Sequence, residues 1–152
     1  MRGLALFLFA CGVIAISEAQ AQTDLTPATA VMKLEIRDAR ADETAAGGSS
    51  TVSMLLTNPT DITLELVGAS TPLASQTLLQ RYGTTREGLL QVVPQPKLLI
   101  PARGEVVMAP GALEIQLIGA ITEFKQGLEL PLTLKFADGT TRVLRVTIQG
   151  DR

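Results

Sequence analysis

The chain of 152 residues contains no histidine, no tryptophan and a single cysteine, Cys11. Cys11 lies inside an apolar run from Leu4 to Ile16, so removal of this run would leave neither a thiol nor an imidazole. These absences exclude a Ser-His-Asp triad, a Cys-His nucleophile pair, a zinc finger and a disulfide. Ser/Lys hydrolysis remains conceivable on residue types alone, but no G-x-S-x-G or S-x-x-K motif is present. We therefore predict no catalytic residues and no enzyme activity.

Aromatic residues and clustered positive charge are also scarce. Aromatic residues make up 3% of the chain, whereas hydrophobic residues make up 46%, so aliphatic side chains must fill the core. The formal net charge is −2 and no block of basic residues occurs. Because a surface that follows phosphates needs clustered Lys and Arg, we expect no nucleic-acid partner. The length fits one domain with a substantial core.

The N-terminus has the organisation of an export signal. Arg2 supplies positive charge, Gly3 to Ile16 is apolar, and Ala19-Gln20-Ala21 is a small-x-small cleavage site. This predicts a signal peptide over residues 1–21 and a periplasmic protein with no membrane attachment after cleavage. The apolar run is short for a membrane span. An uncleaved anchor and a lipid attached to Cys11 are the alternatives.

Polar residues dominate the segment that follows the predicted signal. Residues 22–30 are expected to form a flexible leader. Beyond it, Met32, Leu34 and Ile36 alternate with charged residues, which predicts a half-buried strand. Residues 38–50 contain little apolar character and a Gly-Gly pair, which predicts a loop.

Strand-like segments then recur at short spacing, and no stretch predicts a helix of ten or more residues. Asp138-Gly139 separates the last two segments, and this pair favours a tight hairpin turn. Some nine or ten short strands predict a single antiparallel sandwich or barrel. The further segments are 51–57, 62–66, 77–82, 88–93, 98–100, 105–108, 113–117, 130–136 and 142–148.

The order of these segments resembles the PCu(A)C-type periplasmic copper chaperones over roughly residues 31–148. Three stretches carry the resemblance: 51–61 with its Asn-Pro turn, 66–70, and 100–119 with its Pro-Gly turn. A Gln-Gly pair and the segment 130–136 follow in the family's order. The resemblance implies an all-β, cupredoxin-like antiparallel β-sandwich over residues 31–149. It also implies Cu(I) binding by two His and two Met, and delivery of copper to cytochrome c oxidase.

The positions that match the family's copper ligands hold other residues here. The His-x-Met pair falls on Glu114 and Gln116, the first His on Gln80 or Arg81, and its partner Met on Val92. Carboxylate and amide oxygens are hard donors and poor Cu(I) ligands. We therefore expect a degenerate site with no metal or other cofactor. Only the family resemblance suggests that copper could bind.

The same region is a candidate for binding a protein partner. Glu114 and Gln116 are two residues apart on a strand and so share a face, and Arg81 and Tyr82 could mark a binding edge. Three alternatives remain at this stage. The pair Glu114 and Gln116 could hold a hard metal, or it could lie on an ordinary exposed strand face. Tyr82 could be no more than a half-buried anchor beside a turn.

The methionines allow one further hypothesis. Met32, Met54 and Met108 lie in predicted strands and could form a relocated thioether site for copper. Methionine more commonly fills gaps in aliphatic cores, which is the alternative interpretation.

Together these observations predict an exported, periplasmic PCu(A)C-like protein whose altered site does not bind Cu(I) tightly. Such a protein would act as an accessory factor in copper delivery or cytochrome c oxidase assembly, through a protein partner in the periplasm. The alternative is a protein-binding or structural β-sandwich module with no connection to copper.

Overall fold

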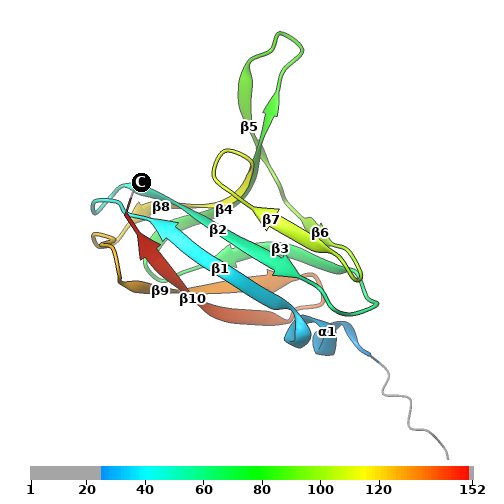
Figure 1. Ribbon diagram of the computed structural model, residues 1–152. Helices are drawn as coiled ribbons and strands as arrows, with labels where there is room; N and C mark the ends of the chain where they lie inside the picture. Colours follow the sequence, from blue (N-terminus) through cyan, green and yellow to red (C-terminus); the bar gives the residue numbers. More distant parts are fainter. Residues whose placement is uncertain (1–24, 151–152) are drawn as a thin grey trace, which may run out of the picture.

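The computed structural model describes residues 25–150 and contains one short helix and ten strands (Figure 1). The predicted signal peptide and Cys11 lie outside the described residues. No helix between residues 25 and 150 combines the length and apolar character needed to cross a membrane. The elements are α1 (Pro27–Lys33), β1 (Glu35–Asp42), β2 (Ser49–Thr57), β3 (Leu64–Ser70), β4 (Ala74–Thr84), β5 (Leu90–Pro94), β6 (Leu98–Ile100), β7 (Glu105–Met108), β8 (Leu113–Ala120), β9 (Glu129–Phe136) and β10 (Thr141–Gln149).

The strands form one continuous sheet in the order β5-β4-β8-β2-β1-β10-β9-β3-β6, and β7 pairs with β2 beyond the part of β2 that contacts β8. The all-β sandwich prediction is confirmed. The expectation of a purely antiparallel sheet is wrong in one place, because β1 and β10 run parallel. These two strands are far apart along the chain, and hydrophobic alternation within a strand does not encode the direction of its distant neighbour.

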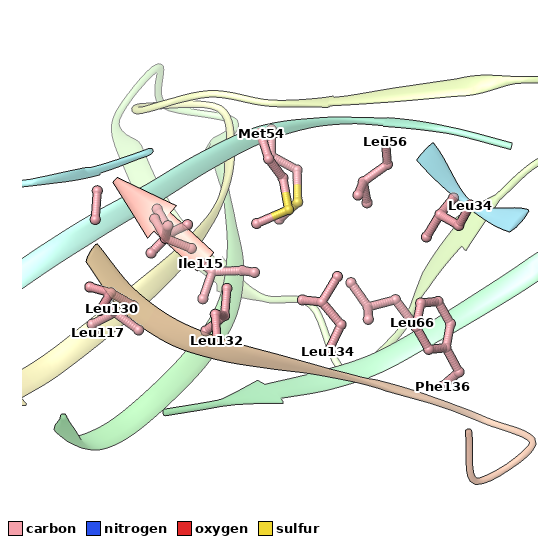
Figure 2. Close-up of a cluster of buried hydrophobic side chains, with 14 of the residues drawn as sticks. Leu34, Met54, Leu56, Leu66, Ile115, Leu117, Leu130, Leu132, Leu134 and Phe136 are labelled. Carbon is pink, nitrogen blue, oxygen red and sulfur yellow. The ribbon is translucent and has the colours of Figure 1, made fainter. Parts of the chain in front are cut away.

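The core lies between the two layers into which this sheet folds. Met54 and Leu56 from β2 point toward Leu132 and Leu134 from β9 (Figure 2). Alternate residues of β9 are buried, as period-two patterning requires. Aliphatic side chains supply most of this core, which agrees with the scarcity of aromatic residues. The core therefore uses one face of each layer and leaves the opposite faces available for a site.

The chain enters the sandwich through α1, where the sequence predicts a leader and then a strand. Thr26 caps the helix, because its Oγ1 accepts a hydrogen bond from the amide of Thr29 at 3.2 Å. Pro27 at the first helical position is already set at a helical φ. Ala30 and Val31 are buried against the core, so residues 27–30 belong to the packed domain rather than to a flexible leader.

Contacts with a distant strand hold the end of this helix. The guanidinium of Arg142 on β10 donates to the backbone carbonyls of Val31 and Met32, each at 2.8 Å. A seven-residue helix is marginal by itself, and burial and this contact stabilise it. The predicted strand from residue 31 is therefore wrong, and the strand begins at Glu35.

The predicted loop over residues 38–50 is also shorter in the structure. β1 continues to Asp42 through a β-bulge, where the pairing with β2 shifts between Arg37 and Arg40. Asp38 has a positive φ of 52°, which this irregularity accommodates. The sequence pattern loses its alternation at this point because the bulge inserts residues out of phase.

The end of β4 pairs with β5 to form a hairpin that extends away from the sandwich, and we call residues 80–94 the arm (Figure 1). The predicted turn over residues 83–87 lies two residues later in the structure. The amide of Thr85 donates to the carbonyl of Leu89 at 2.8 Å, and Gly88 has φ +82°. Glycine at that position allows the left-handed backbone that closes the turn.

The predicted Asn-Pro turn after β2 is confirmed, and hydrogen bonds join it to the segment between β6 and β7. Asn58 is buried, and its Nδ2 donates to the carbonyls of Ile62 at 2.7 Å and Pro101 at 3.1 Å. Its Oδ1 accepts from the amide and the hydroxyl of Thr60 at 3.1 and 2.7 Å. One side chain therefore joins the β2–β3 turn to the segment between β6 and β7.

We expect Asn58→Ala to lower the free energy of unfolding by about 2–3 kcal/mol, because buried carbonyls lose their donors. Urea denaturation monitored by circular dichroism measures this. Asn58→Asp should also destabilise the fold, since a carboxylate cannot donate to these carbonyls. The exposed Thr141→Ala serves as the control. Equal stability of Asn58→Ala and Thr141→Ala would contradict the role assigned to Asn58.

Candidate functional site

Strand register brings the predicted ligand positions onto one face of the sheet. Gln80 on β4 is directly opposite Glu114 on β8, and Tyr82 on β4 is opposite Val92 on β5. Gln116 follows Glu114 by two residues and therefore shares its face. The structure thus groups these side chains at the base of the arm, and we call these five residues the site face.

Arg81 does not belong to this group. It pairs with Leu113 and Val93 in the register, so its side chain is on the face opposite that of Gln80 and Tyr82. The assignment of Arg81 to the partner-binding face is therefore wrong. Of the two positions proposed for the family's first His, Gln80 is the one that faces Glu114.

Glu114 is the centre of the site face and is only 2% exposed. One carboxylate oxygen accepts from Nε2 of Gln80 at 2.9 Å, and the other accepts from the amide of Gly111 at 2.9 Å. The interpretation of this pair as an ordinary exposed strand face is wrong for Glu114. Gln116 is half-buried, and its Oε1 accepts from the hydroxyl of Thr51 on β2 at 3.2 Å.

A tight turn before β8 covers Glu114. The amide of Ala109 donates to the carbonyl of Leu113 at 2.8 Å, and the amide of Ala112 donates to the carbonyl of Ala109 at 3.1 Å. Gly111 has φ +74°, a left-handed conformation that directs its amide back to the carboxylate. Sequence reasoning identified Pro110-Gly111 as a turn but missed its role as a donor to the site.

The buried carboxylate changes the electrostatics of its neighbour. The pKa of Tyr82 lies above its ordinary value of 10.0, mainly because the negative charge of Glu114 disfavours the phenolate. Partial desolvation and a hydrogen bond between the two side chains act in the same direction. Tyr82 is therefore coupled electrostatically to Glu114, and it is half-buried, as the interpretation of an anchor beside the turn also expects.

The donor set of the site face does not suit Cu(I). It offers carboxylate, amide and phenol groups, whereas Cu(I) prefers thiolate, thioether and imidazole. The oxygens of Glu114 already accept hydrogen bonds from Gln80 and Gly111. Across residues 25–150, no group of three or more His, Cys, Asp or Glu is arranged to hold a metal ion.

The methionines named as an alternative copper site lie in different environments. Met54 and Met108 face each other across the β2–β7 pairing, and each is buried in the core. Met32 lies on α1 and is 64% exposed. The positions of Met54 and Met108 agree with the interpretation that methionine fills gaps in the aliphatic core.

Comparison of the sequence with known proteins identifies its family. A family model described as "Putative lipoprotein LpqE-like" matches residues 34–148. The chain belongs to the LpqE-like family. The curated protein "Putative lipoprotein Lxx21020" of Leifsonia xyli subsp. xyli is 28% identical over 146 residues, which cover 95% of this chain and 83% of that protein.

Solved structures with a similar fold are PCuAC domains. The copper-bound PCuAC domain from PmoF2 matches with a TM-score of 0.63 at 18% identity, covering 78% of this chain and 94% of that domain. The copper(I) form of DR1885 from Deinococcus radiodurans matches with a TM-score of 0.58 at 31% identity, covering 75% and 78% of the two chains. The LpqE-like chain therefore has the PCuAC β-sandwich fold that the resemblance implied.

The single tyrosine gives a direct test of the Tyr82–Glu114 coupling. In ultraviolet absorbance titration, we expect the phenol of the LpqE-like protein to ionise above pH 10.0. Glu114→Gln should lower this pKa toward 10.0, because the repelling charge is removed. Glu105→Gln changes an exposed carboxylate on β7 and should leave the titration unchanged. Identical curves for both variants would show that Glu114 does not act on Tyr82.

The raised pKa also predicts a pH dependence of stability. The folded state binds the phenol proton of Tyr82 more tightly than the unfolded state does. The protonated phenol therefore contributes to the free energy of unfolding, and this contribution is fully present below the unfolded pKa near 10.0. It is lost as pH rises through the folded pKa. Tyr82→Phe should therefore reduce the alkaline loss of stability, measured by urea denaturation at several pH values.

Proposed function

We propose that this LpqE-like protein is an extracytoplasmic accessory factor whose former copper position has become a protein-binding surface that does not bind Cu(I) tightly. One observation supports the proposal: Glu114, which the sequence resemblance matches to a ligand position, is buried, and its oxygens accept hydrogen bonds from Gln80 and Gly111. A carboxylate held in this way stabilises the apo arrangement and leaves no soft ligand for Cu(I).

The surroundings of Glu114 favour a protein as the ligand. Leu78 and Val92 lie on the same face of the arm and its base, and Val92 is 50% exposed. Tyr82 adds a partly polar aromatic group, a type enriched in interfaces. Exposed apolar and aromatic side chains beside a few hydrogen-bonded polar groups are a combination that protein interfaces use. By resemblance to the copper chaperones, the partner belongs to copper delivery or cytochrome c oxidase assembly.

Export of the chain is part of the proposal. The family description and the name of the Leifsonia protein both include lipoprotein, which supports a location outside the cytoplasm. Cleavage after Ala21 gives a periplasmic protein that begins at Gln22, whereas lipid attachment would use Cys11. Intact-mass measurement of the protein from its native host distinguishes these two outcomes. Retention of residues 1–21 without lipid would contradict both.

For the wild-type chain, we expect Cu(I) binding too weak to compete with a chelator. The test is a Cu(I) titration in the presence of a competing chromophoric chelator. Retention of Cu(I) against the chelator would remove the proposal of a degenerate site. If the wild-type chain does not bind Cu(I), the result agrees with the proposal of a degenerate site.

Restoring the family's ligand types should restore binding, because the backbone of the site face is retained. We expect Gln80→His, Val92→Met, Glu114→His and Gln116→Met together to bind Cu(I) far more tightly than wild type. The gain should exceed the roughly 10- to 100-fold that outer-shell partners alone contribute to metal affinity. The control carries a His-x-Met pair on β10, Thr141→His with Val143→Met. Equal affinity of the two variants would show that the site face has no special geometry for copper.

A photo-reactive residue tests the partner surface directly. Placed at Leu78, it should crosslink a periplasmic protein in cells, and Glu114→Ala should reduce this crosslinking by disturbing the surface. The same residue at Val143, on a distant strand, is the control. Crosslinks to copper-delivery or oxidase-assembly proteins support the proposal. Crosslinks only to unrelated proteins favour a β-sandwich module without a copper connection.

A further inference from the structure

Two cavities flank the bulge of β1, and the side chains of Asp38 and Arg40 belong to the walls of both. The first cavity has a volume of about 250 Å³, and its other walls are mostly apolar. The second has a volume of about 300 Å³ and is more polar, since β10 contributes Thr147 and Gln149. The bulge places residues 38 and 39 between two pairs of the β1–β2 ladder, which opens the sheet surface here. The apolar wall of the first cavity includes Met54, Leu55, Val107 and Met108.

Arg40 is held firmly at the boundary between the two cavities. It pairs with Ser53 on β2 and with Thr147 on β10, so neighbours on both sides fix its backbone. Its Nε donates to Oγ of Ser53 at 3.2 Å, and Ser53 is only 5% exposed. No hydrogen bond or ion pair to another residue between 25 and 150 engages its two terminal nitrogens. These nitrogens are therefore available donors in a fixed place, and a carboxylate is the group that a guanidinium fork binds best.

Asp38 supplies a negative charge to the same cavities. Its φ of +52° lies in the left-handed region, which aspartate adopts more readily than most residues. Among the ion pairs of the described residues, none joins Asp38 to Arg40. The cavities thus contain one cationic and one anionic group that do not neutralise each other.

We propose that these cavities bind a small zwitterion with an apolar side chain, that is, a free apolar α-amino acid. The terminal nitrogens of Arg40 donate to its carboxylate, and the carboxylate of Asp38 accepts from its ammonium group. The apolar side chain of the ligand lies in the first cavity against Leu55 and Val107.

Other kinds of small ligand match these walls less well. An anion bound at Arg40 is repelled by Asp38, and a cation bound at Asp38 is repelled by Arg40. An uncharged apolar ligand removes water from both charged groups without replacing their hydration. Sites for drug-sized ligands measure about 300–1,000 Å³, so the apolar cavity admits a smaller molecule.

The cavities are distinct from the site face. The turn over residues 109–112 borders both, because Ala109 lines the first cavity and Gly111 donates to Glu114. The inference does not rest on the proposed function, since the binding needs neither copper nor a protein partner.

The methionine methyl groups report binding directly. The full chain, isotope-labelled at these methyl groups, is titrated with leucine as the probe and followed by nuclear magnetic resonance. We expect the signals of Met54 and Met108 to shift until saturation, because both line the first cavity. Met32 lines neither cavity and is the internal control. Stationary Met54 and Met108 signals at every leucine concentration would overturn the proposal.

Two analogues of leucine test the need for both charges. N-acetylleucine lacks the ammonium group and leucinamide lacks the carboxylate, so each should bind about tenfold or more weakly than leucine. In Asp38→Asn, the advantage of leucine over N-acetylleucine should disappear. Asparagine also tolerates the left-handed backbone, so this variant keeps the bulge. Equal affinity of the wild-type chain for all three compounds would rule out recognition of a zwitterion.

Arg40 and Arg37 form a matched pair of variants on the same strand. Arg40→Gln should weaken leucine binding about tenfold or more, because the carboxylate loses its charged donor. Arg40→Lys keeps the charge but not the fork, so its affinity should be intermediate. Arg37→Gln should bind as wild type does, since the guanidinium of Arg37 is bound to Glu35 at 2.6 Å. Equal losses in Arg40→Gln and Arg37→Gln would contradict the role of Arg40.

Discussion

The buried carboxylate of Glu114 is the interaction on which the site depends. It is removed from water and has hydrogen-bond donors from β4 and from the turn before β8. Burial of a charged group is costly unless such donors replace its hydration. Gln80 and Gly111 meet this requirement, and their contacts fix the base of the arm against the body of the sandwich. The effect on the pKa of Tyr82 follows from the same charge.

The contact between Gln80 and Glu114 can be compared with the copper site that the family resemblance implies. The resemblance predicts that Gln80 and Glu114 match copper-ligand positions, and in this structure a hydrogen bond joins the two side chains. The two strands can keep their register without a metal because backbone pairing fixes it along most of β4. The fold of the LpqE-like chain is therefore compatible with a site face made of carboxylate, amide and phenol groups.

Local sequence signals predicted the parts of the fold that local chemistry decides. The Asp138-Gly139 turn is present between β9 and β10, with φ +86° at Gly139. The Asn-Pro turn is present because Asn58 has nearby backbone partners. The helix α1 escaped prediction, since its support comes from Arg142, which is more than a hundred residues away in the sequence. The bulge in β1 escaped for a related reason, because it is defined only against β2.

The sequence by itself determined that no imidazole is available and that short alternating strands build the domain. It also predicted which residues match the family's ligand positions. Only the tertiary structure decided that Gln80 rather than Arg81 meets Glu114, that Glu114 is buried, and that β5 has an open edge. The physical reason is that composition and alternation are properties of a segment, whereas register, burial and strand edges depend on which distant segments lie side by side.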